Sequence, residues 1–307
     1  MGSTTMERNT QEMFEVGPCE NGYQMGFLIG KRFSHQIKSR LATDLILQQQ
    51  LLPYSQTIQS QPLITSLCNT NRKKFRRYWD ELVGTAEGSG VPILHPILLN
   101  FRKEILPFIS KTQIELNADT SEDDCSDILV VNDSLAIAAH NEDANVSLVG
   151  HTYLIEGKLS NGLSFTAYTY AGELPSCAFG FNNSGVAFTL NSVPPTEDEI
   201  VAGSIGRNFI SRDLLEATDI DDALRVQDKN STSRQRRAAE LPKRSKTDFL
   251  QLLGDGKDPK YPIYMRGPTL HTLCTTMIDV DEQTLTIFEG NPKEELTSHV
   301  FQMSTQE

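Results

Sequence analysis

The sequence lacks long apolar runs and carries little basic charge. No hydrophobic stretch approaches the roughly 18 residues expected of a membrane-spanning helix, so we expect no membrane partner. Lys and Arg total 28 against 40 for Asp and Glu, which leaves a net charge of −12. Binding to nucleic acid requires a surplus of cations to neutralise phosphates, so we expect no nucleic-acid partner either.

Cysteine is also scarce, and its five residues are irregularly spaced without a C-x-x-C pair. This pattern supports neither a zinc nor a redox motif. Residues 140–143, His-Asn-Glu-Asp, are of metal-binding types, but no second group of ligands follows at a suitable spacing. We therefore expect no metal and no cofactor, and the ordinary interpretation of each cysteine is a small buried hydrophobic residue.

We recognise no targeting signal in the first or last residues of the sequence. The first residues, MGSTTMERNTQEMFEVG, lack the apolar centre of a secretory signal. Met6 stands where a myristoylation motif requires Ser or Thr, and the final STQE is not a peroxisomal signal. From these features we expect a cytoplasmic protein.

The apolar spacing changes once along the chain. Residues 20–110 predict helices, with apolar side chains at four-residue intervals from Met25 to Leu45. Residues 117–124, NADTSEDD, are typical of an acidic loop, and beyond them the spacing becomes two, as in DILVVND, HTYLIEGKL and GVAFTLN. Strands, then helices near residue 210, then strands again predict an α+β layered fold rather than a parallel βαβ array.

Cys125 opens the first of these strand-like stretches, directly after the acidic loop. Acidic neighbours raise the pKa of a thiol, so the intact chain offers a poor nucleophile. Cleavage between Asp124 and Cys125 would place a new α-amine on the residue that carries the thiol. Such an amine titrates near ~7.7–8.0, so it can serve as the base for its own side chain without a histidine partner.

Two accessory groups would complete a site of this kind. Asp143, at the end of the strand expected to pair with the one that Cys125 opens, offers a carboxylate to orient the amine. Asn191, at the end of FTLN, offers an amide to stabilise an oxyanion. The alternatives are that Asp143 is a plain turn residue and that Asn191 simply ends a strand.

Five stretches, DDCSD, AHNED, YAGELP, FGFNNSGVAFTLNSV and GRNFISRDLLEA, follow an informative order and spacing. They resemble the acyl-coenzyme A:6-aminopenicillanic acid acyltransferase-like family, cysteine N-terminal nucleophile hydrolases of the peptidase C45-like type. The resemblance runs from about Val16 to the C-terminus. It implies a four-layer αββα sandwich, a precursor that cuts itself before the nucleophile, and acyl transfer or hydrolysis. The implied partner is a small-molecule acyl donor, either acyl-CoA or an N-acyl compound.

The resemblance also assigns roles to individual residues. The implied catalytic residues are the nucleophile Cys125, the carboxylate Asp143, the oxyanion donor Asn191 and the arginine Arg212, with Arg207 as a competitor for the last role. Substrate-binding residues are expected among His140, Asn141, Tyr170 and Phe179. Together with Tyr168 and Leu174, these aromatic residues suit an apolar acyl group, although they could equally belong to the core.

Cleavage would yield a mostly helical α chain, residues 1–124, and a nucleophile-bearing β chain, residues 125–307, which together form one αββα domain. Two features depart from the family. Asp124 stands where relatives often have glycine, and the chain looks shortened near Asn230–Ser231, where relatives have further strands. We expect this shortening to expose apolar sheet surface and to disturb the pairing of the C-terminal strands. The alternative function is therefore a catalytically impaired, shortened member with a regulatory or interaction role.

Overall fold

Two five-stranded sheets form the centre of the protein. The computed structural model describes residues 12–109, 125–132, 135–191, 202–224, 245–257, 262–267, 270–294 and 296–303. The predicted α+β class is confirmed. The first sheet has the order β1 (Met13–Cys19), β4 (Thr152–Leu159), β5 (Ser164–Tyr170), β6 (Phe179–Asn182) and β7 (Ala187–Thr189). The second has the order β10 (Thr297–Gln302), β9 (Thr284–Phe288), β8 (Leu270–Asp279), β3 (Leu135–Asn145) and β2 (Ser126–Asn132).

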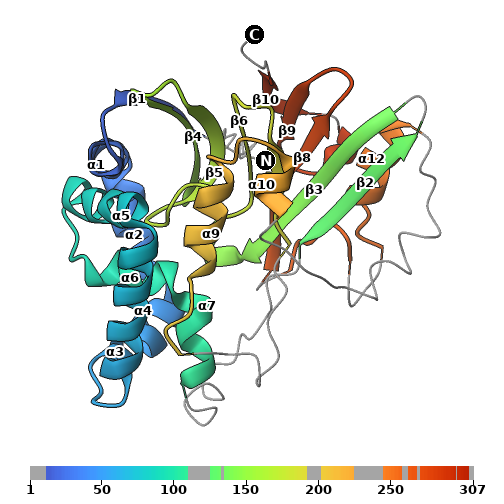
Figure 1. The fold of residues 1–307 in the computed structure, drawn as a ribbon. Coiled ribbons are helices and arrows are strands. Elements are labelled where there is room, and N and C mark those ends of the chain that lie inside the picture. Colours follow the sequence, from blue (N-terminus) through green and yellow to red (C-terminus); the bar gives the residue numbers. More distant parts are fainter. Residues whose placement is uncertain are drawn as a thin grey trace.

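Helices lie on the outer side of each sheet. The N-terminal helices are α1 (Gly22–Arg32), α2 (Ser34–Thr43), α3 (Leu52–Ser55), α4 (Ser60–Lys74), α5 (Arg76–Ser89), α6 (Leu94–Asn100) and α7 (Arg102–Ile105), with a π-helix at Leu47–Leu51. Later in the chain come α9 (Arg207–Leu214), α10 (Ile220–Leu224) and α12 (Lys246–Leu253). Figure 1 shows the N-terminal helices beside the first sheet and α12 beside the second, with the two sheets between them. Within the described ranges, no helix has the length and apolarity needed to cross a bilayer.

The strand β1 was missed by the sequence analysis, which predicted the N-terminal part to be helical. It pairs in parallel with β4, so that Met13 lies opposite Leu154. Its sequence, MFEVGPC, contains Gly-Pro near its end, which is more typical of a turn than of a strand. The N-terminal part therefore contributes an edge strand to the first sheet as well as the helices that cover it.

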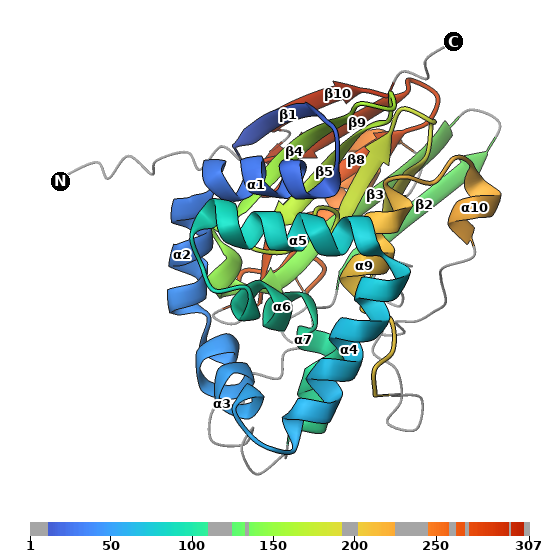
Figure 2. The same ribbon diagram turned by 60° about the vertical axis from the view of Figure 1, so that its left-hand side comes forward.

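Helices α1 and α5 lie side by side along their lengths on the outer side of the first sheet (Figure 2). Gly26 of α1 explains the close approach, because a Cβ atom there would lie 1.9 Å from the carbonyl oxygen of Glu81. Gly84 of α5 faces the carbonyl of Tyr23 in the same way, at 2.2 Å. Glycines on the facing sides of α1 and α5 thus let the two helices pack backbone to backbone.

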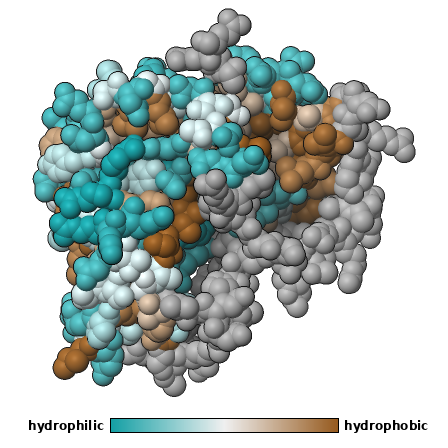
Figure 3. All heavy atoms as spheres, in the orientation of Figure 1, coloured by the Kyte–Doolittle hydropathy of each residue, from teal (hydrophilic) through white to brown (hydrophobic). Residues whose placement is uncertain are grey.

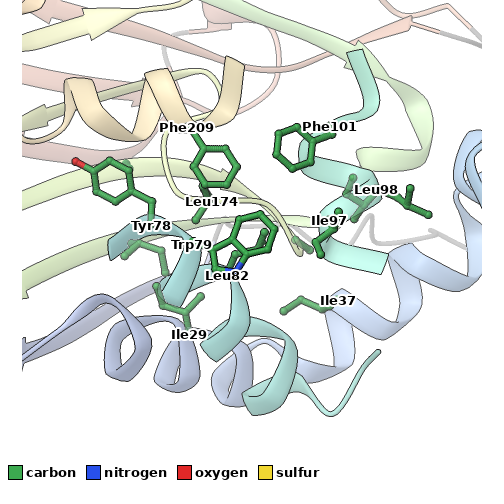
Figure 4. Close-up of a cluster of buried hydrophobic side chains, with 14 of the residues drawn as sticks. Ile29, Ile37, Tyr78, Trp79, Leu82, Ile97, Leu98, Phe101, Leu174 and Phe209 are labelled. Carbon is green, nitrogen blue, oxygen red and sulfur yellow. The ribbon is translucent and has the colours of Figure 1, made fainter. Parts of the chain in front are cut away.

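Three hydrophobic clusters hold these elements together. The largest lies between the N-terminal helices and the first sheet, where Phe209 stacks on Phe101 with ring centroids 5.5 Å apart (Figure 4). A second cluster joins residues of both sheets, including Tyr168 and Ile278. The third packs α12, through Phe249, against the second sheet. Apolar burial therefore fixes most of the N-terminal helices, α9, α12 and the central strands of both sheets.

The strand β2 is an edge of the second sheet. Leu129 and Val131 on it are 73% and 85% exposed, and Figure 3 shows apolar residues gathered over this part of the molecule. Exposed apolar surface on the sheet agrees with our expectation for a shortened chain, although the junction near residue 230 lies outside the described residues. The C-terminal strands β8 and β9 pair regularly with each other from Thr275–Phe288 to Asp279–Thr284. The register shifts once where β8 meets β3 and once where β9 meets β10.

Candidate functional site

Cys125 lies directly before β2, at the start of the hairpin formed by β2 and β3. The pairs run without a break from Asn132–Leu135 to Ser126–Asn141, and the same register places Cys125 opposite Glu142. The thiol is buried, with 7% of the residue exposed. Its sulfur donates to Glu142 Oε2 at 3.3 Å and lies 3.7 Å from the carbonyl oxygen of Asp143. The carboxylate that accepts a hydrogen bond from the thiol is therefore that of Glu142. The sequence analysis gave no role to Glu142 and named Asp143 as the carboxylate of the site.

His140 completes this cluster with two carboxylate partners. Its Nε2 lies 2.9 Å from Glu142 Oε2, and its Nδ1 lies 2.8 Å from Asp127 Oδ1. Residues two apart on a strand share a face, which brings His140 and Glu142 together, and Asp127 is the residue paired with His140 across the hairpin. The sequence analysis expected no histidine partner for Cys125, and the structure places a fully buried one beside it.

The charges of this cluster shift the protonation of its members in opposite directions. Burial, and then the charge of Glu142, raise the pKa of Cys125 to about 12, although His140 acts against both. Burial alone would lower the pKa of His140. The charge and hydrogen bond of Asp127, with bonds to Cys125 and Glu142, outweigh burial and raise that pKa well above its usual value. In this state the cluster holds a protonated thiol beside an imidazolium.

The cluster also contacts the first sheet. The hydroxyl of Tyr170 on β5 donates to Glu142 Oε1, so the two oxygens of this carboxylate have different partners. The ring of Phe179 on β6 meets the His140 ring edge-on, with centroids 6.1 Å apart. Tyr170 and Phe179, two of the four residues expected to bind substrate, therefore contact Glu142 and His140, the side chains next to Cys125.

A pocket begins at Tyr170 and is lined by charged side chains of both signs. Glu173 in its wall pairs with Arg40 and accepts a hydrogen bond from Asn208 at 2.7 Å. Arg207 lines the same pocket and donates to the carbonyl of Cys177 at 3.1 Å. This lining differs from the apolar acyl pocket that the aromatic residues had predicted.

Asn141 and Asp143 have side-chain partners other than the thiol. The amide of Asn141 donates to the carbonyls of Leu253 and Ile263, at 2.8 and 3.1 Å, so it ties the end of α12 to the sheet. These bonds give Asn141 a structural role, and the substrate-binding role stays a prediction. Asp143 is buried, and its carboxylate accepts a hydrogen bond from Thr272. Its predicted bond to a free α-amine stays a prediction.

Arg212 is not brought to Cys125. Its guanidinium is buried against Glu81, with Nε 3.1 Å from Oε2, and it also bonds Glu216 at 3.2 Å. It lies over the rings of Phe165 and Tyr78 as well. The contacts of Arg212 are those of a structural residue, and its catalytic role stays a prediction, whereas Arg207 lines the pocket.

The remaining predicted residues are either exposed or outside the described ranges. Asn191 follows β7, the edge of the first sheet, and is exposed. Its oxyanion role stays a prediction. Asp124, and with it the predicted cleavage site, lies outside the described residues.

The cluster brings together a thiol, an imidazole and a carboxylate, which are the three side-chain groups that commonly bind metal ions. One ligand atom from each of Cys125, His140 and Glu142 lies within 4.8 Å of the others. The sequence analysis found no second ligand group because it considered spacing along one strand. Cys125 comes from the neighbouring strand and supplies the missing ligand.

Comparison with known proteins agrees with the motifs. The chain is similar to a beta-alanyl-dopamine/carcinine hydrolase of Drosophila melanogaster, with 29% identity over 214 residues. The match covers 66% of this chain and 54% of the relative, so the chain spans about half of that curated relative's length. Residues 130–230, which begin just after Cys125, match the family model of acyl-coenzyme A:6-aminopenicillanic acid acyl-transferase, and the family resemblance predicted from the motifs is thereby confirmed.

Proposed function

We propose that this protein is a cysteine acyltransferase or amidohydrolase that acts on acyl amides or acyl thioesters, with Cys125 as its nucleophile. The observation that carries the proposal is the buried hydrogen bond from the Cys125 thiol to Glu142, whose carboxylate also binds His140. A thiol, a proton acceptor and a proton donor in contact are the groups that acyl transfer requires. The family match next to this cluster, and a relative named as a hydrolase, support the same reaction class.

The contacts suggest how protons move during the reaction. Glu142 Oε2 accepts the thiol proton while the sulfur attacks the carbonyl carbon of the substrate. The imidazolium of His140 then protonates the departing amine or thiol as the bond to the carbonyl breaks. Water or an acceptor amine attacks the resulting thioester, which restores the thiol and returns a proton to the cluster. Asn191 is proposed to stabilise the oxyanion.

The same groups account for self-cleavage. In the uncut chain the nitrogen of Cys125 is part of a peptide bond, so no α-amine is available as a base. We propose that Glu142 and His140 serve the first attack, on the bond between Asp124 and Cys125. Once that bond is cut, the new α-amine joins Glu142 as a proton acceptor for the thiol, and Asp143 orients the amine. The helices and the two stacked sheets then form the four layers of an N-terminal nucleophile hydrolase.

The pocket beside Tyr170 favours a polar substrate. Its wall includes Arg207, Glu173 and Lys103, which suit charged or hydrogen-bonding groups better than a long hydrocarbon chain. The relative is named for beta-alanyl amides, whose acyl part carries an amino group. We therefore propose small N-acyl amides with a polar acyl group, beta-alanyl amides first among them.

A substrate panel tests this function. The wild-type chain is assayed with a beta-alanyl amide, an amide of a long-chain fatty acid and an acyl-CoA, with release of amine or thiol as the readout. Turnover of the beta-alanyl amide is expected, with loss in Cys125→Ala and retention in Cys68→Ser, since Cys68 lies in α4 within the helical core. Activity above about a tenth of wild type in Cys125→Ala would rule out this nucleophile. No turnover of any compound by an uncut wild-type chain would support the impaired, regulatory alternative.

A further inference from the structure

The cluster around Cys125 has the composition of a transition-metal site. A thiol, an imidazole and a carboxylate meet there from two neighbouring strands, and all three residues are buried. A single oxygen, Glu142 Oε2, lies 2.9 Å from His140 Nε2 and 3.3 Å from the sulfur. We propose that Cys125, His140 and Glu142 bind a divalent metal ion of the zinc class, and that the ion reversibly blocks the nucleophile.

The spacing of the ligand atoms fits a tetrahedral ion after a small expansion. Bond lengths of about 2.1 Å to nitrogen and oxygen and about 2.3 Å to sulfur place tetrahedral ligands about 3.4–3.6 Å apart. The observed separations from Glu142 Oε2 are 2.9 and 3.3 Å. The ligand atoms therefore need to move apart by only a few tenths of an ångström to admit the ion, and small changes in side-chain torsion angles allow this.

The surrounding hydrogen bonds are those that metal ligands require. A histidine ligand usually donates its second ring nitrogen to a carboxylate, which fixes the ring and makes the first nitrogen a better ligand. Asp127 occupies this position on His140, at 2.8 Å from Nδ1. Tyr170 donates to Glu142 Oε1 and leaves Oε2 directed at the other two ligands. Both outer partners are in place without the ion.

The chemistry of the ligands selects the class of metal. A thiolate favours Zn²⁺ over Mg²⁺ and Ca²⁺, which prefer oxygen ligands. Binding forms bonds from the metal to the Cys125 sulfur and to His140 Nε2, and it releases both the thiol proton and the Nε2 proton of the imidazolium to solvent. The charges of the thiolate and the carboxylate balance that of the ion, which offsets the cost of burying them. Three protein ligands leave a fourth position for water or for the α-amine that cleavage would create.

The consequence for activity rests on the proposed function, but the binding itself does not. A sulfur bonded to the metal cannot attack a carbonyl carbon, so both self-cleavage and turnover stop until the ion leaves. Cobalt(II) is a suitable probe, since it occupies zinc sites and a bound thiolate gives it an intense charge-transfer absorption. The readout needs no substrate and remains valid if the chain turns over nothing.

The experiment titrates the full chain with Co²⁺ at fixed pH and then adds Zn²⁺. We expect the thiolate band to saturate at one equivalent and to disappear on addition of Zn²⁺. Cys125→Ser should abolish the band, Glu142→Gln should weaken binding at least about tenfold, and Cys68→Ser should change nothing. Circular dichroism checks that each variant is folded, and Glu142→Gln, which keeps its size and shape, covers the case in which Cys125→Ser fails to fold.

Several outcomes would overturn the proposal. These are the absence of a thiolate band in wild type, a band that persists in Cys125→Ser, or one that Cys68→Ser removes. Where the chain is active, Zn²⁺ should suppress turnover and a chelator should restore it, and turnover that rises with Zn²⁺ would refute the inhibitory role. Loss of activity in Cys125→Ala together with no Co²⁺ binding would retain the proposed function and refute only the metal site.

Discussion

Replacing Arg212 with alanine tests whether this residue is structural or catalytic. The ion pair between Arg212 and Glu81 has both side chains about 1% exposed. Removal of the arginine leaves the Glu81 carboxylate buried without its main counter-ion. Breaking a buried pair in this way costs about 3–5 kcal/mol of unfolding free energy. For a protein of 307 residues that corresponds to a fall in the thermal midpoint of roughly 5–8 °C.

The control for this prediction is an ion pair on the surface. Arg76 pairs with Asp80 at 3.0 Å, but their side chains are 64% and 38% exposed, so Arg76→Ala should cost less than about 1 kcal/mol. Replacement of both buried partners, as Arg212→Met with Glu81→Leu, should recover much of the lost stability, because no unpaired charge remains. Differential scanning calorimetry measures all four proteins.

Activity per folded molecule distinguishes the two roles. If Arg212 only holds α9 against α5, then kcat and KM measured well below the thermal midpoint should stay close to wild type. A variant that keeps its thermal midpoint but loses about a hundredfold or more in kcat would refute this reasoning and return Arg212 to the catalytic site.

Three further predictions follow from other parts of the structure. Asn191→Ala should lower kcat by about 10²–10³ with little change in thermal midpoint, and a loss of folding without a selective loss of kcat would favour a plain strand end. Burial raises the pKa of Asp44, but Arg102 and Arg40 outweigh it and lower that pKa overall; its contribution to stability should therefore be full above about pH 4 and lost below. Urea unfolding at several pH values should show a weaker acid dependence in Asp44→Asn, and an equal dependence would contradict this assignment. Leu129→Thr with Val131→Thr should reduce self-association in sedimentation experiments while the monomer's thermal midpoint falls little, because both side chains are exposed on the edge strand, and unchanged association would show that this edge stays unpaired in solution.

Much of the cluster around Cys125 could be read from one hairpin. Leu135 pairs with Asn132, and the ladder continues from there in one register to the pair Ser126–Asn141. That register sets Asp127 opposite His140 and Cys125 opposite Glu142. The period of two then places the histidine and the glutamate on one face. The sequence analysis did not apply this register, and so it named Asp143 as the carboxylate that orients the α-amine and did not identify Glu142 as a partner of the thiol.

Contacts between distant elements could not be predicted in the same way. The hydroxyl of Tyr170 reaches Glu142 only because the two sheets pack face to face. Arg212 on α9 pairs with Glu81 on α5. The position of Glu81 depends in turn on the close packing of α5 against α1. Such pairs depend on the packing of whole elements, and no local pattern in the sequence encodes it. Helix and strand periodicity therefore predicted the elements better than the partners of their charged residues.

The most direct test of the account is the mass of the purified chain. Wild type should yield two fragments that meet between Asp124 and Cys125, with Cys125 as the new N-terminal residue. Cys125→Ala should remain a single chain, since the same sulfur would cut the precursor and attack the substrate. A wild-type chain that stays whole yet hydrolyses amides, or a Cys125→Ala chain that is cut at the same bond, would contradict the claim that Cys125 is an N-terminal nucleophile.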